Sequence, residues 1–424
     1  MKKSMTILTF VLIVAALIFI GAGQASAQVV VDNDGKAVVG NCNSHTTTPY
    51  TTIQAGIDAA AEGETVFVCP GKYVEDLVIQ TTGLNLEGSG YKKTTIVGIA
   101  TLPDSAFPQA DPNIDIQADG VSIHGFTIKS PEVNADEYSS GIVLIGTNIK
   151  IYDNRFKVGA GDVSQAIQTW RDETGGLSDI SGLNISHNTF THLSPIPAGG
   201  HGYEGIYINQ QPDPPTPQNP VIIQNNSFEG ELIRAITTER SNTLILDNEI
   251  TTKHRSDFGG EYPRGIEIQN FGTEGADINN VDVVDNEIHP DKRGFFGVGI
   301  NVSSGDGGNT FLYGNEVKKA EVGVSVQSPG NILTKNEVEE SGTLDCEDGT
   351  TDTGTAGTAN TWIYNTGKHN DPHGICKAIS NKDRDDGHQY SNGKDKDNNQ
   401  YDWGDWWSWG KRGAGHWDDF DHHD

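Results

Sequence analysis

Seven asparagines recur along the chain, each two residues before an apolar residue and each following a run of strand-forming residues. They are Asn154, Asn188, Asn226, Asn248, Asn286, Asn315 and Asn336, with successive spacings of 34, 38, 22, 38, 29 and 21 residues. A recurrence of about 20 to 40 residues is typical of stacked units that cannot bury a core singly. Because the unit has strand and turn patterns without helical periodicity, the sequence predicts an all-β parallel solenoid with turns, or rungs, about 4.8 Å apart.

A second recurring strand precedes most of these asparagines and starts with Gly or Ala followed by Ile or Val. Its copies lie at residues 141–144, 166–169, 205–208, 235–238, 265–268, 299–302 and 323–326. Because side chains alternate along a strand, we expect the residue after the Gly or Ala to point inward, the next outward and the next inward. We interpret the repeated asparagines as an inward ladder whose amides bond to turn backbone and to each other, since buried amides need partners.

The first 27 residues fit an export signal. Two lysines near the start precede an almost unbroken apolar run at residues 7–20, and Ala25-Ser26-Ala27 fits a signal-peptidase site. A membrane anchor is the alternative, but this run is short for a span, and no other segment approaches about 20 consecutive apolar residues. We therefore expect a mature protein that begins at Gln28 and is exported to the cell surface, the periplasm or the medium.

The chain is strongly acidic. Its formal net charge is −29, and it becomes −31 in the mature form because the signal contains two lysines and no acid. Such a charge repels nucleic acid and polyanions in general, and it favours a soluble monomer.

Four cysteines remain in the exported chain, one pair near each end of the repeats. An even number in an oxidising compartment indicates disulfides, and the sequence predicts Cys42–Cys69 and Cys346–Cys376. A zinc site is not expected, because neither pair has the tight spacing that zinc sites show.

One helix is expected, at residues 51–62, where Ile53 and Ile57 are four residues apart and Gly63 follows. It would cover the open end of the first rung and its edge strand. The segments 51–60, 70–75, 84–90 and 95–97 resemble the N-terminal part of the pectin-lyase-like right-handed β-helix superfamily, and they are most similar to pectin methylesterases.

This resemblance implies one right-handed parallel β-helix domain, residues 28–377, after a signal at 1–27 and before a tail at 378–424. Residues 381–424 hold 11 Asp, six Lys or Arg and five of the seven Trp, a composition expected to stay flexible. The tail would fold back on the last rung, stack on sugars or contact a cell-surface partner.

Calcium is the one cofactor that the sequence suggests. Residues 381–387 approach a calcium loop, but their glycine is one place late for EF-hand spacing. His416, His422 and His423 among aspartates would bind transition metals weakly, and a solvated tail is the alternative for both segments.

Ligands of this superfamily usually lie along the outer face of one sheet. The outward residues of the second recurring strand would form a strip of aromatic, amide and carboxylate groups that suits sugar rings and hydroxyls. These residues are Gln168, Trp170, Tyr207, Asn209, Thr237, Glu239, Glu267, Gln269, Asn301 and Ser303. Solvated surface decoration is the alternative.

Loops beside this strip are expected to carry further candidates. Paired carboxylates could act as acid and base at a glycosidic bond, and arginines could hold a uronate carboxylate. The catalytic candidates are Asp172, His201, Glu204, Glu239, Asp257 and Glu267. The ligand-binding candidates are Trp170, Arg171, Tyr207, Asn209, Arg234, Arg240, Arg264 and Gln269.

Catalytic motifs of the similar families match only in fragments. Gly200-His201-Gly202 resembles polygalacturonases, without their other aspartate and Arg-Ile-Lys motifs. Asp257-Phe258 resembles a pectin methylesterase motif, and Asp371-Pro372-His373 matches three letters of a mannuronan epimerase motif. We therefore expect an exported β-helix protein that binds polysaccharide or a cell-surface partner along one sheet. The alternative is a hydrolase or lyase using the loops between Trp170 and Glu267.

Overall fold

The computed structural model describes residues 28–35, 42, 49–100, 112–131, 138–158, 163–169, 179–192, 202–209, 219–252, 263–269, 278–290, 296–303 and 308–378. The expected signal and the segment 379–424, with its calcium-like loop and histidines, lie outside these residues. So do the candidates Trp170, Arg171, Asp172, His201 and Asp257. Within the described residues, no helix has the length and apolar character needed to cross a membrane.

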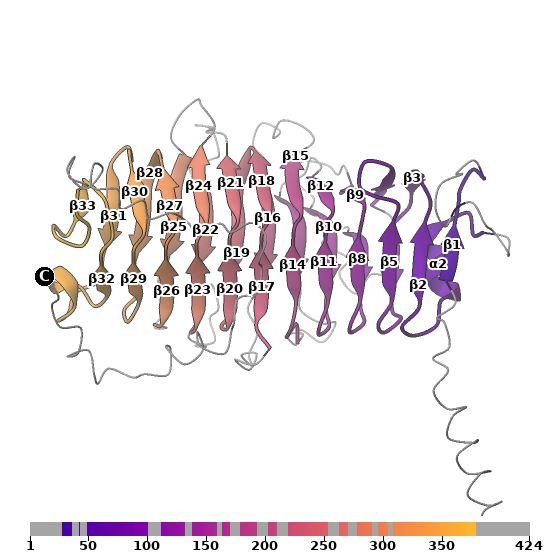
Figure 1. Ribbon diagram of the computed structural model, residues 1–424, viewed down its shortest axis with the longest axis horizontal. Coiled ribbons are helices and arrows are strands. Elements are labelled where there is room, and N and C mark those ends of the chain that lie inside the picture. Colours follow the sequence, from indigo (N-terminus) through magenta and orange to yellow (C-terminus); the bar gives the residue numbers. More distant parts are fainter. Residues whose placement is uncertain are drawn as a thin grey trace, which may run out of the picture. The chain divides into compact units, whose positions relative to one another are not determined.

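The chain winds through three parallel sheets in a fixed order (Figure 1). Each complete rung contains one strand from each of the three sheets, which we call C, A and B in the order in which the chain visits them. After the sheet B strand, the chain returns to sheet C, and its next strand there pairs in parallel with the sheet C strand of the previous rung. Connections between parallel strands are almost always right-handed. The protein is therefore a right-handed parallel β-helix, as predicted.

The strands are short, which suits a triangular rung with two bends and a longer connection. Sheet A contains β1 (Gln28–Val31), β2 (Thr65–Val68), β5 (Asn85–Gly88), β8 (Ser122–His124), β11 (Lys150–Tyr152), β14 (Asn184–Ser186), β17 (Val221–Gln224), β20 (Thr243–Leu246), β23 (Val281–Val284), β26 (Thr310–Tyr313), β29 (Ile332–Thr334) and β32 (Thr361–Ile363). Sheet B contains β3 (Gly71–Val74), β6 (Thr94–Val97), β9 (Thr127–Lys129), β12 (Arg155–Val158), β15 (Thr189–His192), β18 (Ser227–Gly230), β21 (Glu249–Thr252), β24 (Glu287–Pro290), β27 (Glu316–Lys318) and β30 (Glu337–Glu339). Sheet C contains β4 (Leu77–Ile79), β7 (Pro112–Ile116), β10 (Tyr138–Leu144), β13 (Val163–Thr169), β16 (Gly202–Ile208), β19 (Leu232–Thr238), β22 (Arg264–Ile268), β25 (Phe296–Val302), β28 (Ala320–Val326), β31 (Leu344–Asp348) and β33 (Asn370–Asp371).

Apolar side chains in register fill the interior. Ile206 and Ile208 of β16 are fully buried, whereas Tyr207 between them reaches the other face, as the alternation predicted. Inside sheet B, the rings of Phe156, Phe190 and Phe228 stack with centroids 4.9 and 4.6 Å apart. This spacing follows the rung repeat, so one core column continues from rung to rung.

The repeated asparagines form a buried ladder at the bend between sheets A and B. The Oδ1 atom of Asn226 accepts hydrogen bonds from the backbone N–H and Nδ2 of Asn188, at 3.0 and 3.2 Å. Nδ2 of Asn188 also donates to the carbonyls of Ile151 and Ser186. The residue before each asparagine holds a positive φ of 51–66°, which turns the chain sharply. The same contacts continue to Asn365, which the sequence pattern missed because no apolar residue stands two places later.

Helix α2 (Ile53–Ala59) covers the first rung, with Ile53 and Ile57 buried in the core. It is shorter than the predicted 51–62, because Thr52 acts as the N-cap, accepting from the N–H of Ala55, and Ala60 is already extended. Cys42–Cys69 is bonded next to the end of β2, and Cys346–Cys376 is bonded near the C-terminal end of the β-helix, both as predicted.

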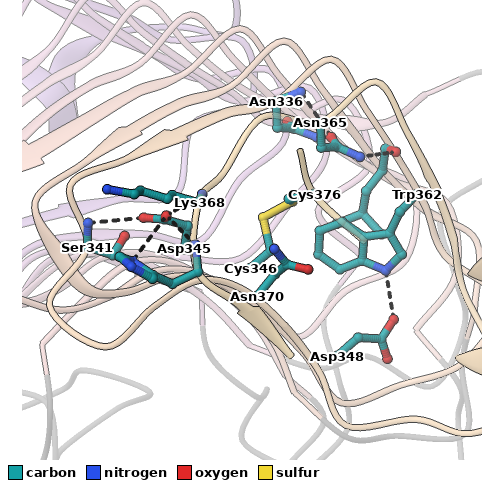
Figure 2. The surroundings of a disulfide bond; sticks show 12 residues. Asn336, Ser341, Asp345, Cys346, Asp348, Trp362, Asn365, Lys368, Asn370 and Cys376 are labelled. Carbon is teal, nitrogen blue, oxygen red and sulfur yellow. Dashed lines mark hydrogen bonds and ion pairs between the residues drawn. A yellow bond between two sulfur atoms is a disulfide. The ribbon is translucent and has the colours of Figure 1, made fainter. Parts of the chain in front are cut away.

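Buried aspartates hold the C-terminal end closed around the second disulfide (Figure 2). Asp348 accepts hydrogen bonds from Nε1 of Trp362 at 2.7 Å and Oγ1 of Thr350 at 2.6 Å. Asp345 accepts from the backbone N–H groups of Lys368 and His369 at 2.7 and 3.0 Å. Each carboxylate thus joins β31 to the segments that cover it. The short helix η3 (Thr355–Gly357) adds a contact to edge strand β32, because Oγ1 of Thr355 accepts from the N–H of Trp362.

Candidate functional site

Three neighbouring strands of sheet C carry charged side chains on the outer face. Glu204 of β16 pairs in register with Arg234 of β19, which pairs with Arg264 of β22. The sequence assigned these three residues to loops, but the structure places them on strands beside the predicted strip. The reason is a bend at the Gly or Ala that follows each of them. The pairing of β16 with β19 skips Gly205 and Ala235, so the alternation shifts there. A Cβ atom at Gly205 would lie 2.4 Å from the carbonyl oxygen of Ala235, so this close approach requires a glycine.

Arg234 joins two carboxylates from different rungs. Its Nη1 lies 2.6 Å from Oε1 of Glu204, and its Nε lies 2.7 Å from Oε2 of Glu267. Arg264 forms a second ion pair with Glu267, and Asn301 donates to the same carboxylate at 3.3 Å. The side chains of Glu204 and Glu267 are 5% and 1% exposed. Such buried charges depend on their partners, so the network behaves as one unit.

A second contact set lies beside this network. The hydroxyl of Tyr207 donates to Oε1 of Glu239 at 2.7 Å, and Nε2 of Gln269 lies 3.4 Å from the same oxygen. In the opposite orientation of its amide, Gln269 donates to Oε1 of Glu267 at 2.9 Å. Burial, followed by the negative charge of Glu239, raises the pKa of Tyr207. Tyr207 therefore keeps its proton and acts as a hydrogen-bond donor throughout the physiological pH range.

In one column of this face, two buried acceptor atoms have no hydrogen-bond partner in the described part of the protein. They are Oγ1 of Thr237 and Oε1 of Gln168. Gln168, Tyr207, Thr237 and Glu267 stand in register on consecutive strands. A buried polar atom without a partner costs about 1–3 kcal/mol. Both atoms can accept hydrogen bonds, so hydroxyl groups of a ligand along this column would satisfy them.

Arg240 lies just beyond β19 and is 2% exposed. Its Nη2 is 3.7 Å from Oδ1 of Asp179, an ion-pair distance too long for a hydrogen bond. The guanidinium has no hydrogen-bond partner among the described residues. Burial lowers the pKa of Arg240 to about 10, and Asp179 opposes this shift. The group stays charged at neutral pH and would be stabilised by an anion.

The structure therefore brings together about half of the predicted site residues. The residues that meet on β16, β19, β22 and just after them are Glu204, Tyr207, Arg234, Glu239, Arg264, Glu267 and Gln269. Asn209 and Arg240 lie at its margin, where the N–H of Asn209 donates to Oγ1 of Thr169. Gln165 donates to Glu204 at 3.1 Å and is not among the predicted site residues. The strand alternation predicts outward positions only for the residues that follow the Gly or Ala of each strand, and Gln165 precedes Ala166.

No group of three or more His, Cys, Asp or Glu in the described residues is arranged to hold a metal ion. The described site has three carboxylates and two paired arginines, with Arg240 beside them. These side chains offer hydrogen bonds and ion pairs at the outer face of sheet C.

The chain is similar to several solved structures. The A-module of a mannuronan C-5 epimerase from Azotobacter vinelandii shares 16% identity, with 77% of this chain and 93% of that chain covered and a TM-score of 0.42. A PL6 family polysaccharide lyase from Pseudopedobacter saltans shares 12%, with coverages of 78% and 86% and a TM-score of 0.45. Pectin methylesterase from Aspergillus niger shares 11%, with coverages of 84% and 89% and a TM-score of 0.30.

Residues 37–238 match the model of a family described as a protein of unknown function, DUF1565. No curated protein sequence matches the chain. Arguments about function therefore rest on the site itself.

Proposed function

We propose that this protein binds a polysaccharide along the outer face of sheet C, centred on β16, β19 and β22. The observation that carries the proposal is the in-register column Gln168–Tyr207–Thr237–Glu267, in which two buried acceptor atoms have no partner among the described residues. A sugar chain offers hydroxyl donors in a row and C–H faces for the ring of Tyr207.

The ligand's charge is limited by the same geometry. Arg234 and Arg264 are already paired with Glu204 and Glu267, so they neutralise protein carboxylates. Arg240 is the cation best placed to receive a uronate carboxylate, since it is held by one long ion pair. We therefore propose a ligand that is neutral over most of its length and carries an acidic sugar near Arg240.

Binding to a panel of neutral and acidic polysaccharides would test the proposal. Thr237→Val keeps the shape of the side chain and removes the hydroxyl, so it should weaken binding about tenfold, roughly 1.4 kcal/mol. Ser325→Ala makes a similar change on β28, three strands along the same column, and should leave binding unchanged. Equal affinity of both variants and the parent chain for every glycan would refute this site.

A polysaccharide-cleaving enzyme is the second candidate, and the contact between Tyr207 and Glu239 favours it. Tyr207 retains its proton and can serve as a general acid, while Glu239 can accept a proton. Reducing ends or unsaturated uronates that disappear in both Tyr207→Phe and Glu239→Gln would establish cleavage. Binding without product would leave a recognition protein.

We also propose that the protein is exported. Two disulfides are typical of oxidising compartments outside the cytoplasm. N-terminal sequencing of the secreted or periplasmic product should begin at Gln28. A product that retains Met1 and sediments with membranes would support the anchor instead.

A further inference from the structure

The outer face of sheet B carries its own pattern of charge, separate from the site on sheet C. Two columns of outward side chains flank the buried core column, and they run through all ten strands. On the N-terminal half, the charged residues of these columns are Lys72, Lys129, Arg155 and Lys157. On the C-terminal half, the acidic residues are Glu229, Glu249, Glu287, Glu316, Glu337 and Glu339.

Like charges stand directly opposite each other within each half. Lys129 and Lys157 are in register, and Glu249, Glu287, Glu316 and Glu337 form a continuous run. Neighbouring strands are about 4.8 Å apart, and like charges in register destabilise a sheet. Burial, then the charges of Arg155 and Lys129, lower the pKa of Lys157. The basic half of this face therefore concentrates positive charge on a chain whose formal net charge is −29.

One cation breaks the acidic half. Lys318 forms an ion pair with Glu316. At the centre of the sheet, β15 presents the uncharged Thr189 and Thr191, and β18 presents Ser227 and the first glutamate of the acidic half, Glu229. The sign change therefore falls at the midpoint of the ten strands, between β15 and β18.

We propose that this face is the contact between two copies of the chain, packed with their solenoid axes antiparallel. A twofold axis along the strand direction, between β15 and β18, exchanges β12 with β21, β9 with β24 and β3 with β30. Arg155 then faces Glu249 of the second copy, and Lys72 faces Glu337. Lys129 lies diagonally opposite Glu287. Each contact occurs twice, because a twofold interface uses the same surface on both copies.

The size of the face limits the strength of the contact. Ten strands about 4.8 Å apart and about 13 Å long form a face of roughly 43 by 13 Å. Two such faces bury about 1,100 Å², which is the low end for a specific interface. The dimer is therefore weak, and it opposes the monomer expected from net charge alone. Long-range repulsion between two acidic chains is screened beyond about 8 Å at physiological salt, whereas facing ion pairs lie closer than that.

Sedimentation velocity of the full mature chain across a concentration series, at about 0.15 M and about 1 M salt, would test the contact. We expect a dimer that strengthens with concentration at the lower salt and dissociates at the higher salt. K129E/R155E and E249K/E287K should each raise the dissociation constant at least tenfold. The control K150E changes an exposed lysine of sheet A, away from this face, and should have no further effect beyond its added negative charge.

The variant carrying all four exchanges of charge gives the decisive result. It restores opposite signs across the twofold axis, so it should dimerise as the parent does. A parent chain that stays monomeric across the series would overturn the proposal, as would a folded fourfold variant that fails to dimerise. Binding of an anionic polysaccharide to a monomer through Lys129 and Lys157 would also overturn it. None of these outcomes affects the site on sheet C, because that site uses other strands.

Discussion

Nε of Arg234 lies 2.7 Å from Oε2 of Glu267, and the carboxylate side chain is 1% exposed. Breaking a buried ion pair leaves an uncompensated charge and costs about 3–5 kcal/mol, far more than a surface pair. Glu267→Gln should therefore lower the free energy of unfolding by about 3 kcal/mol, measured by urea denaturation. Glu316→Gln, which removes the partner of half-exposed Lys318, should cost less than about 1 kcal/mol. A loss below about 1 kcal/mol for Glu267→Gln as well would mean that the buried network contributes no more to stability than a surface ion pair.

The asparagine ladder should respond most strongly in its middle. Asn226 accepts two hydrogen bonds from Asn188 and donates to Asn248 and to the carbonyl of Ile185. Asn226→Ala leaves the buried backbone N–H of Asn188 without an acceptor, so unfolding should be about 3 kcal/mol easier. Asn219→Ala, at the surface, should change stability by less than about 0.5 kcal/mol. Thermal unfolding monitored by circular dichroism would show the difference, and a silent Asn226 variant would contradict the structural role.

Most of the fold could be predicted from the sequence, because the rung repeat and strand alternation are local patterns. The inward positions of Ile206 and Ile208 followed from period two alone. The bend at Gly205 could not be predicted this way, because it arises from the close approach of the neighbouring rung's backbone. For that reason Glu204 and Arg234 were expected in loops.

The candidate site was predicted less completely than the fold. Tyr207, Glu239 and Gln269 follow the bend, where the alternation holds, and they were expected on one face. The ion pairs among Glu204, Arg234 and Glu267 depend on which rungs become neighbours and on side-chain rotamers, and no sequence spacing encodes either. The arginines were consequently interpreted as free for a ligand, whereas two of them are paired within the protein.

Asp282 should make stability depend on pH. It stands on the outer face of sheet A, in register with Leu244 and Phe311, and burial raises its pKa to about 6. A raised pKa in the folded state means that burial favours the protonated carboxyl. The loss of stability caused by ionising Asp282 is therefore absent below about pH 4, grows as the pH rises and is complete above about pH 6.

Asp282→Asn removes the charge and keeps the shape. The variant should match the parent in stability near pH 3.5 and exceed it at pH 7, by at most about 3 kcal/mol. Urea denaturation of both chains across this range isolates the effect, because all other titrating groups are shared. Asp119→Asn, at an exposed turn, is a control for removing one negative charge. A constant difference between Asp282→Asn and the parent at all pH values would show that Asp282 does not titrate in this range.

The disulfide Cys346–Cys376 should stabilise the C-terminal end beyond what its buried aspartates provide. It joins residues 30 apart, and closing a loop of that length in the unfolded chain is worth about 3.5 kcal/mol. Asp345 and Asp348 already tie β31 to the covering segments (Figure 2). Cys346→Ser/Cys376→Ser should therefore keep the fold but unfold at a lower urea concentration, and added Asp348→Asn should open this end. Hydrogen exchange at Trp362 and its neighbours would report that opening locally. Loss of protection throughout the β-helix would instead show that the solenoid unfolds as one cooperative unit from this end.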